Sequence, residues 1–149
     1  MSAADEILEH IRRAQTLASE LGIKNILQPG IVKELVLARL LGHELIPDKA
    51  KADARDADGS LYEYLCSLGS SNNFQIDRLT AANLDRIRRN RAFFFAFFVD
   101  ALTLGEVFEI DTATVLEEAQ RQLGRSKNKI SHLNLSGKWV RERGKCVYP

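Results

Sequence analysis

Hydrophobic and polar positions alternate along this chain with two different periods. Apolar residues recur at three- and four-residue spacing from about residue 4 to residue 21, which predicts an amphipathic helix ending at Gly22. A second, more apolar run over residues 31–41 lies between Gly30 and Gly42 and predicts a helix buried on several sides. Pro47 then stops a short strand that we expect over residues 43–46.

The middle of the chain changes to a period of two. Two extended runs within residues 52–67 flank the turn sequence Asp56-Ala57-Asp58-Gly59, which is typical of a β-hairpin. Residues 68–73 are a polar loop, and residues 81–90 are expected to be helical. The aromatic run over residues 93–99 predicts a strand buried on both faces. The five phenylalanines in it are better explained by core packing than by a platform for stacking single-stranded bases.

The last third repeats the alternation of strands and helices. Residues 107–110 predict a strand, and Asp111 or Thr112 caps a helix that runs to about Leu123 and is closed by Gly124. Residues 130–148 alternate like extended structure, with a turn at Arg143-Gly144. The order of elements predicts one domain over residues 1–149, with an α/β (α+β) fold in which a mixed sheet is flanked by helices.

Composition narrows the class of protein. The 149 residues are 45% hydrophobic and 28% charged, which suits one globular domain with one core. No apolar run is long enough to span a membrane, and two cysteines are too few for a disulfide framework, so we expect a cytoplasmic protein. The net charge of +1 does not exclude a nucleic-acid partner, because carboxylates that bind metal offset basic side chains in the sum.

Two acidic residues lie on the predicted hairpin. Asp53 is on the first arm and Glu63 on the second, so the hairpin can bring both carboxylates together. Side chains alternate along a strand, so Glu63 and Leu65 share one face, whereas Tyr62, Tyr64 and Cys66 lie on the other. Two carboxylates beside the main-chain carbonyl of Tyr64 would make a hard oxygen site for Mg²⁺ or Mn²⁺. On spacing alone, a pair of solvated surface carboxylates is the simpler interpretation.

The spacing Asp-x9-Glu on a hairpin resembles that of the PD-(D/E)XK nucleases. The segment LGIKNILQPGIVKELVLARLLGHELIPDKAKADARDADGSLYEYL is similar, without gaps, to the N-terminal half of PvuII-like type II restriction endonucleases. The segment NKISHLNLSGKWVRERGKCVYP resembles the C-terminal segment of that family. The resemblance implies a restriction-endonuclease-like fold and a homodimer, with the N-terminal helices (about 4–41) contributing to dimerisation. It also implies Mg²⁺-dependent hydrolysis of double-stranded DNA at a short palindromic site.

Within this resemblance, Asp53 and Glu63 would be catalytic metal ligands, together with the Tyr64 carbonyl. The third motif position is normally a lysine that orients the attacking water and offsets charge, and here it is Leu65. Loss of one charge-stabilising group typically costs about 100- to 1000-fold in rate. Leu65 could be a deliberate substitution that traps an uncut DNA complex, or it could mark a natural homologue that cuts poorly. Alternatively, a lysine elsewhere reaches the site, and the candidates are Lys33, Lys49 and Lys51.

The resemblance also implies where DNA is contacted. Base-reading side chains are expected in the loop Ser70-Ser71-Asn72-Asn73 and just after it, at Asn73, Gln75, Asp77 and Arg78. Phosphate contacts are expected from a basic run of four arginines (Arg86, Arg88, Arg89 and Arg91), of which Arg88 is the strongest candidate. A second group of phosphate contacts is expected from a loop with Lys127, Asn128, Lys129 and His132. Without the resemblance, the expected base-reading segment is explained as a polar surface turn. The basic run is then explained as a solvated helix face whose arginines pair with Asp85.

Three functions therefore stay open. The leading one is a type II restriction endonuclease. The second is a sequence-specific DNA-binding homologue without catalytic activity, and the third is a structural module that keeps only the fold. Salt-dependent DNA binding separates the third from the other two, because neutralising phosphates gives a negative salt slope.

Overall fold

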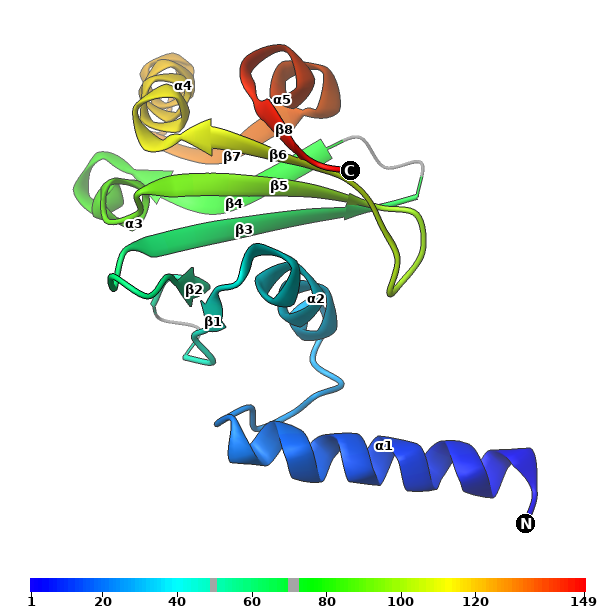
Figure 1. Cartoon of the computed structure of the whole chain (residues 1–149). Helices are drawn as coiled ribbons and strands as arrows, with labels where there is room; N and C mark the ends of the chain where they lie inside the picture. The colour runs from blue at the N-terminus through cyan, green and yellow to red at the C-terminus, as the bar shows by residue number, and fades with distance from the viewer. Residues whose placement is uncertain (49–50, 70–72) are drawn as a thin grey trace.

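The core of the protein is a mixed six-stranded sheet. The computed structural model describes residues 1–48, 51–69 and 73–149, and Figure 1 shows the chain. The strand order is β1-β2-β3-β5-β6-β8, in which β3 and β5 are parallel and the other neighbours are antiparallel. The strands are β1 Glu44–Leu45, β2 Ala54–Arg55, β3 Leu61–Leu68, β5 Ala92–Phe98, β6 Leu104–Asp111 and β8 Lys145–Tyr148.

A separate two-stranded ribbon lies beside this sheet. It pairs β4 (Asn73–Thr80) with β7 (Ile130–Ser136) in an antiparallel register. The helices of the described residues are α1 Ala3–Glu20, α2 Ile31–Leu41, α3 Asp85–Arg88, α4 Thr112–Arg125 and α5 Gly137–Arg143, with a 3-10 turn at Ala81–Asn83. The predicted mixed sheet flanked by helices is confirmed.

Each face of the main sheet has its own apolar cluster. On one face, Leu37 and Ala38 of α2 pack with Tyr62, Tyr64 and Phe94. On the other face, α4, the two-stranded ribbon and α5 pack over Phe93, Phe95 and Phe97, so that β5 is buried along its whole length. The alternating phenylalanines of β5 therefore fill both layers, as predicted from the aromatic run.

Helix α1 lies apart from both layers (Figure 1). Its N-terminus is fixed by a capping box between Ser2 and Asp5. Ala18 is its buried residue, and it packs with Ile23 and Ile31, so most of the helix is exposed to solvent.

Some predicted elements were wrong in detail. Residues 73–80 form β4, although the sequence suggested only a polar loop up to residue 73. The C-terminal segment is interrupted by α5, because Ser136 caps the main-chain N–H of Trp139 and starts a helix. Gly124 lies inside α4, which ends at Arg125, and Asp111 is its N-cap as expected. Lys49, Ser70, Ser71 and Asn72 lie outside the described residues.

Candidate active site and nucleic-acid interface

The predicted metal ligands Asp53 and Glu63 line the same cavity. The cavity has a volume of about 300 Å³ and lies between the β2–β3 hairpin, α3 and the ribbon. Its lining residues are Lys51, Asp53, Glu63, Ile76, Arg86, Ile87, Arg89 and Phe93. The cavity therefore combines two acidic side chains with three basic ones above an apolar floor.

Asp53 is held in place by its main chain and by its side chain. It directly precedes β2, where its N–H donates to the Tyr62 carbonyl (3.1 Å) and its carbonyl accepts from the Ile46 N–H (2.7 Å). Its Oδ2 accepts a further hydrogen bond of 2.8 Å from the Tyr64 N–H. These bonds fix the carboxylate beside β3 before any ligand arrives.

Glu63 lies on the neighbouring strand in an environment that opposes its negative charge. Burial raises the pKa of the Glu63 carboxyl most, and the charge of Asp53 and a hydrogen bond to it raise the pKa further. The guanidinium groups of Arg89 and Arg86 lower this pKa. The Glu63 carboxyl therefore retains its proton well above the pH at which a glutamate ordinarily loses it.

This environment fits a divalent cation. Two carboxylates that repel each other in a partly buried site are stabilised by a doubly charged ion, and their oxygens are hard donors of the kind Mg²⁺ prefers. In the described part of the chain, no cluster holds three or more His, Cys, Asp or Glu side chains around a common point. A third protein ligand would therefore be a main-chain oxygen, and the Tyr64 carbonyl remains a prediction for that role.

The opposite face of β3 is aromatic and structural. The His43 ring stacks on Tyr62 with centroids 4.4 Å apart, and its Nδ1 lies 2.7 Å from the Tyr64 hydroxyl oxygen. These side chains belong to the layer beneath α2, on the face away from the cavity. His43 thus braces the strand that carries Glu63.

Leu65 follows Glu63 on the cavity face but belongs to the core. It is only 8% exposed and packs in the same apolar cluster as Phe74 and Phe95. The residue in the usual lysine position thus provides neither charge nor a hydrogen-bond donor to the cavity.

The basic residues after β4 divide into two groups. Arg86 and Arg89, three positions apart, line the cavity with the carboxylates. Arg88, chosen from the sequence, instead makes an exposed ion pair of 3.5 Å with Asp85, as the solvated-face interpretation expected. Arg86 also donates a hydrogen bond of 2.9 Å to the Asp77 carbonyl, which connects this segment to β4.

The three candidate lysines differ in their position relative to the cavity. Lys51 lines the cavity, two residues before Asp53. Lys33 of α2 lies on the other side of the sheet, with its Nζ 5.9 Å from the centre of the Phe98 ring. Lys49 is outside the described residues.

The ribbon presents a line of polar side chains. Gln75 faces Asn134 and Asn73 faces Ser136 across the two strands, and all four residues are exposed. The residues between them, Phe74, Leu133 and Leu135, are buried in the core. Asn73 and Gln75 were predicted as base-reading residues, whereas Asn134 was not.

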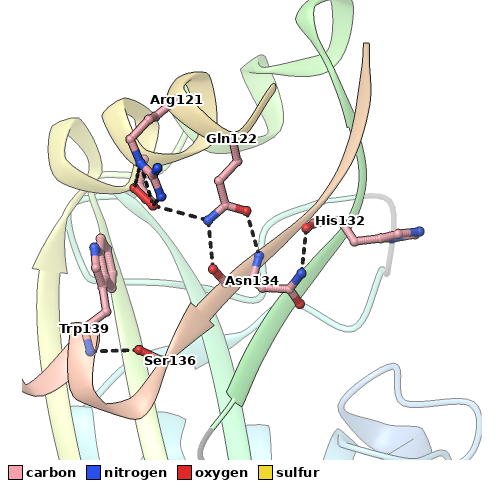
Figure 2. Close-up of polar contacts among 7 residues, drawn as sticks. Arg121, Gln122, His132, Asn134, Ser136 and Trp139 are labelled. Atoms are coloured by element: carbon pink, nitrogen blue, oxygen red, sulfur yellow. Dashed lines mark hydrogen bonds and ion pairs between the residues drawn. The ribbon is translucent and has the colours of Figure 1, made fainter. Parts of the chain in front are cut away.

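Helix α4 holds the strand β7 of this ribbon in place through Gln122. The Gln122 amide donates to the Asn134 carbonyl (2.9 Å) and accepts from the Asn134 N–H (3.2 Å), as Figure 2 shows. Since both main-chain groups of Asn134 point toward α4, Asn134 and Gln75 form a non-hydrogen-bonded pair, in which facing side chains are closest. The Asn134 amide donates to the His132 carbonyl (3.0 Å), and the Ser136 hydroxyl caps Trp139.

A bulge interrupts the ribbon at two of the predicted DNA contacts. The register shifts between Ile76 and Leu79, so Asp77 and Arg78 have no partner in the regular strand register. Arg78 has a positive φ of 51°, and its N–H donates to His132 Nδ1 (3.4 Å). Asp77 Oδ1 lies 3.3 Å from the same nitrogen. The bulge therefore redirects the Arg78 side chain away from the regular alternation of β4.

The second predicted DNA-contacting loop connects α4 to β7. Lys127, Asn128 and Lys129 are exposed in this turn, and Lys129 has a positive φ of 59°. The turn leads directly into the strand that carries His132 and Asn134.

Sequence reasoning missed Asn134 and did not place Arg86, Arg89 and Lys51 together beside the acidic pair. Within the predicted basic run, Arg86 and Arg89 could have been separated from Arg88 by their three-residue spacing at a short helix, which puts them on one face. Asn134 could have been found from the alternation of polar and apolar residues within 130–136. The place of Lys51 depends on how the segment before Asp53 enters the hairpin, and no local pattern predicts that.

The mixed sheet flanked by helices is the fold of the restriction endonucleases. The family model of the restriction endonuclease PvuII matches residues 1–148, and the chain belongs to this family. The family consists of type II site-specific endonucleases, which are DNA-binding hydrolases of restriction systems. A search of curated proteins found no match. Within the described residues, no helix is both long enough and apolar enough to cross a membrane.

Proposed function

We propose that this protein is a Mg²⁺-dependent type II deoxyribonuclease that cuts both strands of duplex DNA at a short palindromic site. The main support is the cavity itself, in which Asp53 and Glu63 lie beside Lys51, Arg86 and Arg89. Two neighbouring carboxylates, with the pKa of Glu63 raised by burial and by the charge of Asp53, suit the hydrolysis of a negatively charged phosphodiester when they are surrounded by cations.

Asp53 and Glu63 would hold the metal, with the Tyr64 carbonyl as a further ligand and Mn²⁺ as a substitute ion. A bound Mg²⁺ would supply an activated water and neutralise charge on the phosphate. The hydrogen bond from the Tyr64 N–H fixes the Asp53 carboxylate, so little reorganisation is needed on binding. Arg86 and Arg89 limit the repulsion within the acidic pair and attract the phosphate.

The reaction itself requires few groups. A water oxygen forms a bond to phosphorus while the bond from phosphorus to the 3′ oxygen breaks. The water gives up a proton and the 3′ oxygen takes one up, leaving a 5′-phosphate and a 3′-hydroxyl. The protein contributes position and charge, which is the main requirement of phosphoryl transfer.

The two-stranded ribbon would read the bases. A β-ribbon fits the major groove, where amide side chains such as Asn73, Gln75 and Asn134 can pair with adenine and Arg78 with guanine. Asp77 would accept from cytosine. Phosphate contacts fall to Arg88 and to the turn containing Lys127, Asn128 and Lys129. These contacts would set the position of the ribbon relative to the cavity.

A second copy of the chain would cover α1. This helix exposes Ile7, Leu17 and Leu21 at 58%, 45% and 62%, although they lie on its apolar face. An 18-residue amphipathic helix with one buried residue needs a partner for that face. A symmetric dimer would present two cavities to the two strands of a palindrome.

Digestion of long phage DNA tests the proposal. The protein and its Leu65→Lys variant are incubated with unmodified phage DNA in Mg²⁺, and the products are resolved on a gel. Discrete fragments from either protein support a site-specific nuclease. Failure of both proteins to cut, together with DNA binding that does not weaken with salt, would refute the nuclease and DNA-binding functions together.

The second candidate function is a DNA-binding homologue that does not cut. The burial of Leu65 in the core favours it, because the usual position of the lysine then contributes no charge to the cavity. This candidate predicts tight, site-selective and salt-dependent binding, with no fragments from either the unmodified protein or the Leu65→Lys variant.

A further inference from the structure

The cavity contains a cation that can replace the one missing at position 65. Lys51 lines the same cavity as Asp53 and Glu63, and it reaches the cavity from the segment that precedes Asp53. Its main-chain N–H donates to the Asp48 carbonyl (3.1 Å), which anchors the backbone of Lys51 itself. Its exposed side chain can therefore approach the space between the two carboxylates and an incoming phosphate.

The other basic groups are less suited to this position. Arg86 is already bound to the Asp77 carbonyl and acts as a brace between α3 and β4. Arg89 lines the same cavity, where its charge offsets that of the acidic pair and lowers the pKa of the Glu63 carboxyl. Lys33 lies across the sheet at the Phe98 ring. Lys51 is thus the one described lysine that lines the cavity.

We propose that the Lys51 ammonium is the catalytic cation of this site, orienting the attacking water and stabilising charge on the phosphate in place of the lysine absent at position 65. This inference rests on the proposed nuclease function. The role is electrostatic, so it adds no proton transfer to the balanced hydrolysis described above. A compact ammonium on a flexible stem can follow the shift of charge from the attacking to the leaving oxygen.

The test compares four proteins: the unmodified chain, Lys51→Met, Lys33→Met as a matched control, and the double variant Lys51→Met/Leu65→Lys. Single-turnover cleavage of phage DNA in Mg²⁺ gives the rate of the chemical step, and duplex binding is measured separately in Ca²⁺. We expect Lys51→Met to slow cleavage by about 100- to 1000-fold while changing DNA affinity by less than about threefold. Lys33→Met should cleave at the unmodified rate, and the double variant should recover at least part of the lost rate.

A second measurement does not depend on cleavage. Mn²⁺ binding to the DNA-free proteins is followed by calorimetry. Removing a positive charge beside two carboxylates should raise Mn²⁺ affinity by about 3- to 10-fold in Lys51→Met and leave it unchanged in Lys33→Met. Thermal melting checks that the variants are folded.

The outcomes separate the inference from the proposed function. Unchanged cleavage by Lys51→Met, or loss of cleavage in an Arg89→Gln variant alone, would overturn the role of Lys51. Cleavage by Leu65→Lys but not by the unmodified chain would also overturn it, while leaving the nuclease scaffold intact. If no variant cuts and none binds duplex DNA in a salt-dependent way, the proposed function itself fails.

Discussion

The Asp53 carboxylate accepts a hydrogen bond of 2.8 Å from the main-chain N–H of Tyr64, the residue that directly follows Glu63. This contact connects the segment before β2 to β3 at the cavity. It serves both stability and function, because the same carboxylate stabilises a buried N–H and faces Glu63.

Two substitutions of Asp53 separate these roles. Asp53→Asn keeps an oxygen that can accept from Tyr64, so its stability should stay within about 0.5 kcal/mol of the unmodified protein. Asp53→Ala leaves the Tyr64 N–H unpaired and should lose about 1–3 kcal/mol in urea unfolding. Both variants should lose cleavage by about 1000-fold, because the metal site loses one of its two charges. Equal stability of the two variants would show that the hydrogen bond contributes nothing.

The raised pKa of Glu63 gives a pH-dependent stability in the absence of metal. Burial and the charge of Asp53 make the folded protein hold this proton more tightly than the unfolded chain does. Stability from this group is therefore complete below the ordinary glutamate pKa and is lost as pH rises toward the folded-state pKa. Glu63→Gln should remove that loss, so the variant becomes the more stable protein by about 1–3 kcal/mol as pH rises.

Urea unfolding in EDTA at several pH values measures this difference. Asp58→Asn, an exposed turn residue, is the matched control and should show no such divergence. The same linkage predicts that Mg²⁺ binding releases protons and strengthens as pH rises, since the ion and the proton compete for one pair of carboxylates. A constant stability difference between Glu63→Gln and the unmodified protein across pH would contradict the assignment.

The contact between Gln122 and Asn134 should control the geometry of the ribbon. Gln122→Ala removes two hydrogen bonds to the main chain of β7 and should lower stability by about 1 kcal/mol, because water can replace part of the loss. Duplex affinity should fall more for the specific site than for random DNA, since the line of amides loses its support. Gln120→Ala, an exposed glutamine on the same helix, should change neither quantity. Fluorescence anisotropy with both DNA types checks this.

Much of the fold could be predicted from the sequence because its signals are local. The apolar period and flanking glycines give α2 its bounds of Ile31–Leu41, and the aromatic run gives β5 as a fully buried strand. The hairpin turn predicts that Asp53 and Glu63 lie close together, whereas their interpretation as metal ligands came from the family resemblance. Their neighbours Tyr62 and Tyr64 follow from alternation along the strand.

What could not be predicted depends on contacts between distant segments. Among the described strands, β4 pairs with β7, whose partner residues lie fifty or more positions further along the chain, so residues 73–80 look like a polar loop until the partner is known. The helix α5 is seven residues long and starts from one serine cap, a signal too weak to interrupt an alternating pattern. The cavity cations come from a segment before Asp53, from α3 and from the residue that caps α3, and only the tertiary fold places them beside Glu63.

The positive φ of Arg78 suggests that this residue lowers the stability of the protein while it contributes to DNA recognition. A left-handed conformation is unfavourable for arginine and tolerated by glycine, so Arg78→Gly should raise stability by up to about 1 kcal/mol. The same change removes a guanidinium from the bulge, and site-specific DNA affinity should fall by about 10-fold or more. Arg78→Ala, which loses the side chain but keeps the strain, should reduce affinity equally without stabilising the protein. A binding defect confined to one of these variants would argue against direct recognition.

The exposed apolar face of α1 predicts the oligomeric state. Ile7→Glu places a charge on this face, and if a second copy covers it, the dimer should weaken by about 10- to 100-fold. Thr16→Glu adds the same charge on the opposite, solvated side of the helix and should leave the dimer intact. Analytical ultracentrifugation measures both, and cleavage of supercoiled plasmid reports the consequence: Ile7→Glu should lose coordinated double-strand cutting while Thr16→Glu retains it. If Ile7→Glu sediments and cuts as the unmodified protein does, α1 is not the dimer interface, and its apolar face must be covered in another way.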